Sequence, residues 1–308
     1  RKTGKELYSY QKGAIQKIFK CFETAQDDYH LLYQLPTGGG KTVIFSEIVS
    51  QYLKTHKKKV LVMTHRIELC KQTSSVLTEF GVQNKVIDSK ANLEDQSEFQ
   101  CFVAMVETLN NRLKDDKLDI SDIGLVIIDE AHYNSFTKLF KFFEKSFILG
   151  VTATPLSSNI ELPMTDNYNE LIVGESIESL IENEFLAQAN MYSYNVGLTS
   201  LVVGANGDYT VKSSEDLYTN NEMLSKLMEA YKERCDGKKT LIFNNGINTS
   251  LFVYDLFRSA GYQVAHLDNT ASKKERTQIL EWFKKTPNAI LTSVSILTTG
   301  FDEPTVES

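Results

Sequence analysis

Leu35-Pro36-Thr37-Gly38-Gly39-Gly40-Lys41-Thr42 is the segment from which the architecture of this chain can be inferred. An apolar run from Tyr29 to Leu35 enters this segment, and a helical pattern from Val43 to Leu53 leaves it. A strand, a glycine loop, Lys-Thr and a helix in this order form a phosphate cradle, because successive glycines let backbone N–H groups surround phosphate oxygens. In such a cradle Lys41 contacts the β- and γ-phosphates, and Thr42 offers its hydroxyl to Mg²⁺. The alternative is a glycine-rich turn that binds nothing, but Gly-Lys-Thr at the start of a helix is a demanding pattern.

A second motif, Val126-Ile127-Ile128-Asp129-Glu130-Ala131-His132, places two carboxylates at the end of an apolar strand. Asp129 is expected to hold Mg²⁺ directly or through water, and Glu130 to orient and deprotonate an attacking water. His132 is placed to sense the γ-phosphate or to contact a partner domain. A surface Asp-Glu pair at a strand end is common alone, but not downstream of a phosphate loop. The predicted catalytic residues are therefore Lys41, Asp129, Glu130 and His132.

Apolar strand-like runs alternate with helical patterns along the chain. Such alternation is typical of parallel sheets covered by helices on both faces, which bind ligands at the carboxyl ends of their strands. We predict an α/β fold with two parallel-sheet domains, residues 1–187 and 188–308, the second ending early. Strands are expected at 31–35, 60–64, 101–104, 125–129, 147–152, 191–194, 240–244, 264–267 and 289–293. Helices are expected at 43–53, 67–80, 107–113, 136–143, 176–185, 223–233, 249–260 and 273–284.

Composition narrows the class of protein. The 308 residues suffice for two ordinary domains, and no apolar run reaches the roughly 18 residues that a membrane span requires. No signal peptide is visible, and the four scattered cysteines predict free thiols in a reducing cytoplasm rather than a zinc site. The net charge of −7 counts against a broad basic surface, although it leaves room for a local positive groove. Because the chain starts at Arg1, we expect the natural N-terminus to lie upstream.

The two motifs together resemble those of the DEAH-type helicases of superfamily 2. Pro36 and Leu35 support this resemblance, because Pro-Thr-Gly-x-Gly-Lys-Thr replaces the more general loop that begins with Gly. The resemblance implies two RecA-like domains that hold ATP–Mg²⁺ in the cleft between them and ratchet a nucleic-acid strand. Residues Pro36, Thr37, Gly38, Gly39, Gly40, Lys41 and Thr42 would then all contact the nucleotide.

Further segments match the same family in the same order. By resemblance, Gln11 reads the adenine edge, whereas the residue segment 62–69 supports the nucleic-acid track through His65 and Arg66. The resemblance also assigns Thr108 to nucleic-acid contact, and Thr152 and Thr154 to the coupling of hydrolysis with strand movement. Less specific alternatives remain: Gln11 could face solvent on an amphipathic helix, and His65 and Arg66 could cap a helix.

The second half carries the weaker matches. The segment 298–302, Thr-Thr-Gly-Phe-Asp, resembles a motif that bridges nucleic acid and nucleotide, which implies contacts from Thr298, Gly300 and Asp302. The Gln-x-x-Gly-Arg-x-x-Arg motif that relatives carry is missing, so we expect a truncated chain that binds ATP but hydrolyses it poorly. Trp282 and Phe283 are expected in the core rather than stacked on a base, and His266 as a packed histidine.

The combination of motifs resembles most closely the RadD-type repair helicases, with XPB-type helicases and the motor subunits of type I and III restriction enzymes as relatives. The predicted function is therefore that of an ATP-dependent helicase or translocase on DNA, with RNA also possible and no membrane involved. Two alternatives stay open: a motor subunit of a type I or III restriction enzyme, and an ATP-gated nucleic-acid clamp that does not unwind.

Overall fold

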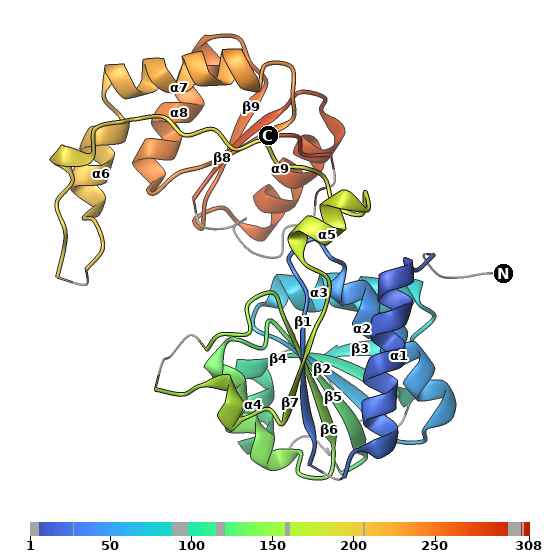
Figure 1. Cartoon of the computed structure of the whole chain (residues 1–308). Helices are drawn as coiled ribbons and strands as arrows, with labels where there is room; N and C mark the ends of the chain where they lie inside the picture. The colour runs from blue at the N-terminus through green and yellow to red at the C-terminus, as the bar shows by residue number, and fades with distance from the viewer. Residues whose placement is uncertain are drawn as a thin grey trace. The chain divides into compact units, whose positions relative to one another are not determined.

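The computed structural model describes residues 6–26, 28–87, 98–114, 121–157, 161–205, 207–294, 303 and 305–308. Two units, Arg1–Asn190 and Met191–Ser308, each contain one parallel β-sheet flanked by helices (Figure 1). The α/β fold with two parallel-sheet domains that the sequence predicts is thereby confirmed. Within the described ranges, no helix is long and apolar enough to cross a membrane.

The first unit is built on a sheet of seven parallel strands in the order β3-β4-β2-β5-β6-β1-β7. Its centre is β5, Ile123–Asp129, in which all seven residues are buried. Such a strand forms from a continuous Val-Ile-Leu run, because a central parallel strand is covered on both faces. The other strands are β1 His30–Gln34, β2 Lys59–Thr64, β3 Asn84–Ile87, β4 Cys101–Met105, β6 Phe147–Thr152 and β7 Glu170–Val173.

Two apolar cores cover the two faces of this sheet, and β5 contributes to both. Leu125 and Ile127 point into the core beneath α1 and α2, whereas Val126 and Ile128 point into the core beneath α4 and η2. This alternation follows from the two-residue period of a strand. The helices of the first unit are α1 Ser9–Thr24, α2 Lys41–Thr55, α3 Ile67–Glu79, α4 Val106–Lys114 and α5 Ile177–Glu182, with 3₁₀ segments η2 Asn134–Phe142 and η3 Met164–Asp166.

The second unit has a three-stranded parallel sheet in the order β8-β10-β9. Phe283 is fully buried on one face, and Trp282 packs against the same cluster, so the expected core role of both residues is confirmed. Its strands are β8 Thr240–Phe243, β9 Val264–Leu267 and β10 Ile290–Ser293. Its helices are α6 Val211–Tyr218, α7 Asn221–Arg234, α8 Ile247–Ser259 and α9 Lys273–Lys285, with the 3₁₀ turn η4 Leu198–Ser200.

Some expected elements differ from the structure. The strand predicted at 191–194 is wrong, because these residues adopt no strand and Met191 is 92% exposed. Their alternating Met and Tyr residues favour extended backbone, but a strand also needs a neighbour to bond with. The helix predicted at 136–143 is a 3₁₀ segment, Asn134–Phe142. The strands β3 and β7 and the helix α6 have no counterpart among the predicted elements.

Candidate functional site

The order of the strands brings the two sequence motifs together. In the first unit β5, β6 and β1 are neighbours, and because they run parallel their carboxyl ends share one edge. The phosphate loop, residues 35–42, follows β1, and the Asp-Glu pair follows β5. Backbone hydrogen bonds connect these ends through β6: Leu35 N donates to Thr152 O at 2.9 Å, and Ala131 N donates to Val151 O at 3.0 Å.

The phosphate loop depends on two glycines with left-handed backbone. Gly38 has φ +83° and Gly40 has φ +81°, values that only glycine adopts without strain. Gly40 is the N-cap of α2, so the helix begins at Lys41 and its N-terminal N–H groups face the loop. The Lys41 side chain is only 9% exposed, and its Nζ lies 3.4 Å from the Leu35 carbonyl oxygen. The loop thus has the backbone of an anion-binding turn.

Two residues of α1 support the loop from outside. Tyr10 Oη donates to the Gly39 carbonyl at 2.7 Å, which gives this carbonyl a partner outside the phosphate-facing surface. Gln11 is 3% exposed, so the alternative that it faces solvent is wrong. Its Oε1 accepts from Tyr8 N at 2.9 Å, and its Nε2 lies 3.4 Å from Tyr10 Oη. Its contact with adenine stays a prediction.

The end of the first unit also packs on the loop, which the sequence does not predict. A Cβ added to Gly38 would lie 2.8 Å from Leu186 Cδ1. The neighbouring Phe185 ring lies 4.6 Å from the Tyr8 ring and 5.1 Å from the Tyr10 ring. No local pattern reveals these contacts, because the partners lie far apart in the sequence.

At the end of β5 the backbone turns sharply. Glu130 has φ +55°, a left-handed conformation that is rare for a residue with a side chain and is often found at functional sites. The Glu130 N–H donates to Asp129 Oδ1 at 3.0 Å. Asp129 remains buried at 7% exposure, whereas the Glu130 side chain is 27% exposed. The two adjacent carboxylates therefore have different surroundings, as their two predicted roles require.

Burial raises the pKa of Asp129 to about 7, and the charge of Glu130 adds to this, whereas Lys41 and the Glu130 N–H act in the opposite direction. A buried carboxylate with so little compensation fits a site that receives a cation, because oxygen ligands of this kind suit Mg²⁺. Thr42, in the first turn of α2, is the other expected ligand and is partly exposed. Within the described ranges no cluster of three or more His, Cys, Asp or Glu residues could hold a metal by itself.

His132 is connected to the end of β6. Its Nδ1 lies 3.0 Å from Thr152 Oγ1 and 3.4 Å from Glu130 Oε2. Thr152 Oγ1 donates to the Thr154 carbonyl at 2.9 Å and accepts from the Thr154 N–H at 3.1 Å. Because the hydroxyl proton of Thr152 is already used in the bond to Thr154, His132 Nδ1 carries the proton of the His132–Thr152 hydrogen bond, and Thr152 Oγ1 accepts this bond. Of the predicted coupling residues, Thr152 thus contacts the predicted γ-phosphate sensor, and Thr154 is bonded to Thr152.

The residues predicted to contact nucleic acid lie at neighbouring strand ends. His65 follows β2, and Thr108 lies in the first turn of α4, directly after β4. Arg66 occupies the N-cap position of α3, yet its side chain makes no cap hydrogen bond. Thr298, Gly300 and Asp302 lie outside the described residues.

His65 is held by aromatic packing. Its ring lies 4.4 Å from that of Tyr133, which in turn lies 4.3 Å from that of His132. Burial lowers the pKa of His65 to about 4, and the charges of Arg66 and His132 act in the same direction. The imidazole is therefore neutral at pH 7.

This pKa predicts a pH-dependent stability of the first unit. In the unfolded chain His65 protonates near pH 6.5, whereas in the folded chain it protonates near pH 4. Between about pH 6.5 and 4 the unfolded chain therefore binds more protons than the folded chain, and the free energy of unfolding falls as the pH falls. The variant His65→Phe keeps a ring but cannot titrate. Its free energy of unfolding should therefore fall by about 1 to 2 kcal/mol less than that of the wild type between pH 7 and 4.5. Calorimetric unfolding of the whole chain at both pH values measures this. The control is His56→Phe, which replaces an exposed imidazole that stacks on Tyr52. If the free energy of unfolding of His65→Phe depends on pH as in the wild type, His65 is not the group responsible for the loss of stability.

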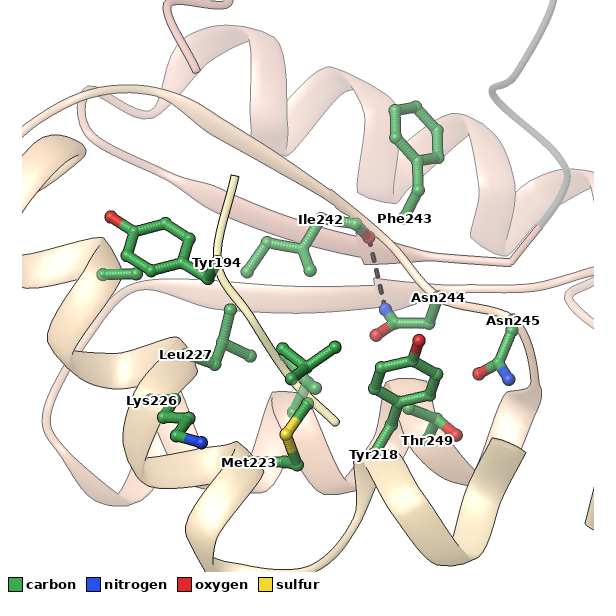
Figure 2. A pocket seen from close by; sticks show the side chains of 13 residues that line it. Tyr194, Tyr218, Met223, Lys226, Leu227, Ile242, Phe243, Asn244, Asn245 and Thr249 are labelled. Atoms are coloured by element: carbon green, nitrogen blue, oxygen red, sulfur yellow. Dashed lines mark hydrogen bonds between the residues drawn. The ribbon is translucent and has the colours of Figure 1, made fainter. Parts of the chain in front are cut away.

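A hollow of about 460 Å³ opens in the second unit, beside the carboxyl end of β8. Figure 2 shows polar groups of Tyr218, Asn244, Asn245 and Thr249 towards one side, and the apolar Leu227 and Met223 with the Tyr194 ring towards the other. Thr249 is 3% exposed, and its hydroxyl has no partner among the described residues. Since open α/β sheets bind ligands at this end of their strands, the hollow is the candidate binding surface of the second unit.

A buried polar network lies close to this hollow. Ser250 Oγ and His266 Nδ1 lie 2.9 Å apart, and His266 Nε2 and Asp268 Oδ2 also lie 2.9 Å apart. Asn244 Nδ2 donates to the same Ser250 Oγ at 3.2 Å. The network joins the ends of β8 and β9 to α8, so His266 is the packed histidine that the sequence predicts.

Two protein families match separate parts of this chain. The family described as "Type III restriction enzyme, res subunit" matches residues 4–157, and the one described as "Helicase conserved C-terminal domain" matches residues 220–308. The first range includes the phosphate loop and the Asp-Glu pair, and the second includes β8, α8 and β9.

Individual proteins agree with the family matches. The chain is 27% identical to a "51.5 kDa protein" of Lactococcus phage (isolate 7-9), over 89% of this chain and 56% of that protein. It is 26% identical to "Putative ATP-dependent helicase IRC3" of Saccharomyces cerevisiae, over 98% of this chain and 46% of that protein. The chain thus spans about half the length of these curated relatives.

Among solved structures, "ATP-dependent Type ISP restriction-modification enzyme LlaBIII bound to DNA" aligns with a TM-score of 0.67 and 16% identity, covering 99% of this chain and 25% of that one. At this identity the likeness concerns the fold, and it identifies the two units as tandem RecA-like domains.

Proposed function

The chain belongs to the family described as "Type III restriction enzyme, res subunit", with a helicase C-terminal domain after it, and from this premise we propose an ATP-dependent nucleic-acid motor. The observation that supports it most is the meeting of the phosphate loop and the Asp-Glu pair at one edge of the first sheet. Within superfamily 2 we assign the chain to the DEAH-type helicases of the RadD and XPB group, on the Asp-Glu-Ala-His motif and its neighbours. DNA is the proposed track, and repair the proposed context.

We assign nucleotide binding to the ATP-binding domain, residues 1–187. Lys41 and the N–H groups of the phosphate loop bind the β- and γ-phosphates, and Gln11 contacts adenine. Thr42 and Asp129 hold Mg²⁺, which when bound neutralises phosphate charge during transfer. Glu130 accepts the proton of the attacking water, since its carboxylate is partly exposed to solvent whereas Asp129 is buried.

The remaining assignments concern the second motor domain, the contacts with nucleic acid and the coupling of hydrolysis to movement. Residues 188–308 form the second motor domain, in which Gly300 and Asp302 complete nucleotide binding. Arg66, Thr108 and Thr298 contact the strand, mainly at its phosphates, so little sequence preference is expected. His65 supports this contact from behind Arg66, because both of its ring nitrogens are buried. Thr152 and Thr154 couple hydrolysis to movement, a role supported by the hydrogen bond of Thr152 with His132 and by that of Thr154 with Thr152. The free thiols favour a reducing compartment such as the cytoplasm.

Two other functions share the same nucleotide site. The family description and the LlaBIII likeness favour the motor subunit of a restriction enzyme, in which case a nuclease acts alongside the motor. An ATP-gated clamp would bind nucleic acid in response to ATP without separating strands. Neither alternative changes the roles assigned to Lys41, Asp129 and Glu130.

An ATPase and strand-separation assay tests the proposed function. The full-length protein is incubated with ATP–Mg²⁺ and either single-stranded DNA, forked duplex DNA or single-stranded RNA. A DNA helicase is expected to raise its ATP turnover with DNA and to unwind the fork. Turnover without unwinding would favour a translocase, ATP-dependent binding without turnover would favour a clamp, and failure to bind ATP would refute the motor.

A further inference from the structure

Three neighbouring rings, tilted relative to one another, connect two strand ends of the first unit. The Tyr133 ring lies 4.3 Å from the His132 ring and 4.4 Å from the His65 ring, with interplanar angles of 37° and 35°. His132 follows β5, His65 follows β2, and these two strands are neighbours in the sheet. Tyr133 therefore bridges the proposed nucleotide site and the proposed nucleic-acid contact.

The two outer rings are attached to different functional segments. His132 Nδ1 is bonded to Thr152 Oγ1 at 3.0 Å and faces Glu130 Oε2 at 3.4 Å, so its position depends on the phosphate-binding edge. His65 directly precedes Arg66, which starts α3, and Thr64 Oγ1 donates to the Arg66 carbonyl at 3.0 Å. A displacement of the His65 ring is thus transmitted to the start of α3.

Hydrogen bonds do not fix the ring of His65. Both of its nitrogens are buried, and neither has a hydrogen-bond partner among the residues that the structure describes. We therefore infer that the contact with Tyr133 sets the position of the His65 ring. Because the three partly buried rings are in contact, a shift of one ring changes the packing of the next.

We propose that Tyr133 is a positioning residue that couples nucleotide binding to nucleic-acid binding through the row His132–Tyr133–His65. The inference rests on the proposed function, because it takes the triphosphate as the ligand at one end and a single-stranded phosphodiester backbone as the ligand at the other. Tyr133 itself touches neither ligand. Its effect appears only when both ligands are present, since coupling is a free energy between two sites.

Linked binding equilibria test this proposal. Fluorescence anisotropy gives the Kd of the whole chain for a labelled single-stranded DNA oligonucleotide, with and without a saturating non-hydrolysable ATP analogue and Mg²⁺. The ratio of the two Kd values is the coupling factor, which we expect to lie between about 5 and 150 in the wild type. Tyr133→Leu should bring the ratio close to 1 while each single-ligand Kd changes little. Tyr133→Phe, which keeps the ring, should retain the wild-type ratio.

Two further variants separate coupling from a general effect on folding. Phe140→Leu removes an aromatic ring of η2, the segment that follows Tyr133. This ring packs on His30 and Tyr168 instead, so the variant should keep the wild-type ratio. The double variant His65→Leu/Tyr133→Leu should lower the ratio no further than Tyr133→Leu does, because both remove the same connection.

Each result decides between the inference and its alternatives. Three results would overturn the coupling role of Tyr133: a wild-type ratio in Tyr133→Leu, a ratio of 1 in the wild type, or additive effects in the double variant. If the wild type still binds the nucleotide in these cases, the proposed function remains intact. Failure of the wild type to bind the ATP analogue, or binding by Lys41→Ala with wild-type affinity, would instead refute the proposed function.

Discussion

Lys41→Ala should weaken the binding of ATP by about 100-fold, since hydrogen bonds to charged groups contribute roughly 1.5 to 3 kcal/mol and Lys41 serves two phosphates. The lysine stands at the first position of α2, where the glycines before it leave the helix N-terminus open to an anion. Alanine keeps the helix, because it is the best helix former, and removes only the ammonium group and its stem. Isothermal titration of the whole chain with ATP and Mg²⁺ measures the effect.

Lys54→Ala is the matched control for this experiment. Lys54 lies in the last turn of the same helix and is exposed, so its loss removes a positive charge without touching the phosphate loop. We expect its Kd for ATP to stay close to that of the wild type. Unchanged affinity in Lys41→Ala, or equal loss in both variants, would contradict the assignment of residues 35–42 as the phosphate site.

Glu130→Gln should lower the rate of ATP turnover by about 10² to 10⁴, the usual contribution of a general base, while the affinity for ATP changes little. Glutamine has the same shape but cannot accept the proton of the attacking water. The left-handed backbone at this position, φ +55°, costs both residues a similar amount, so the turn after β5 should persist. Steady-state phosphate release by the full-length protein with saturating nucleic acid gives the rate, and a separate titration gives the affinity.

Glu144→Gln provides the corresponding control, because Glu144 is an exposed carboxylate of the same unit outside the site. Its turnover is expected to match the wild type. Turnover by Glu130→Gln at the wild-type rate would remove Glu130 from the role of base. A parallel loss of affinity and rate would indicate instead that the carboxylate positions the nucleotide.

The sequence predicts the central strands better than the peripheral ones, for a physical reason. The Val-Ile-Ile run of β5 is buried on both faces and can hardly form anything else in an α/β fold. Edge strand β7 has mostly exposed residues and β3 mostly half-buried ones, so neither shows the apolar run by which a buried strand is recognised. Conversely, Met191 and Tyr192 have the composition of a strand, but no strand in the part of the chain that the structure describes pairs with them.

The same distinction applies to the site. The loop containing Lys41 and the Asp129-Glu130 pair are continuous in sequence and follow strands, so the topology of a parallel sheet suffices to predict that they meet. The contacts of Tyr10 with Gly39 and of Leu186 with Gly38 join distant segments and depend on packing that no local pattern encodes. The raised pKa of Asp129 likewise results from burial in the folded unit rather than from its neighbours in the chain.

The network Ser250–His266–Asp268 matches the template by which serine hydrolases are found in structures, since a serine, a histidine and a carboxylate stand in a row with 2.9 Å between partners. Ser250 is fully buried and already accepts a hydrogen bond from Asn244, so no acyl group can reach its oxygen. The histidine is also reversed, with Nδ1 towards the serine and Nε2 towards the aspartate. A geometric search would therefore report a false esterase here, and accessibility of the nucleophile is the criterion that rejects it.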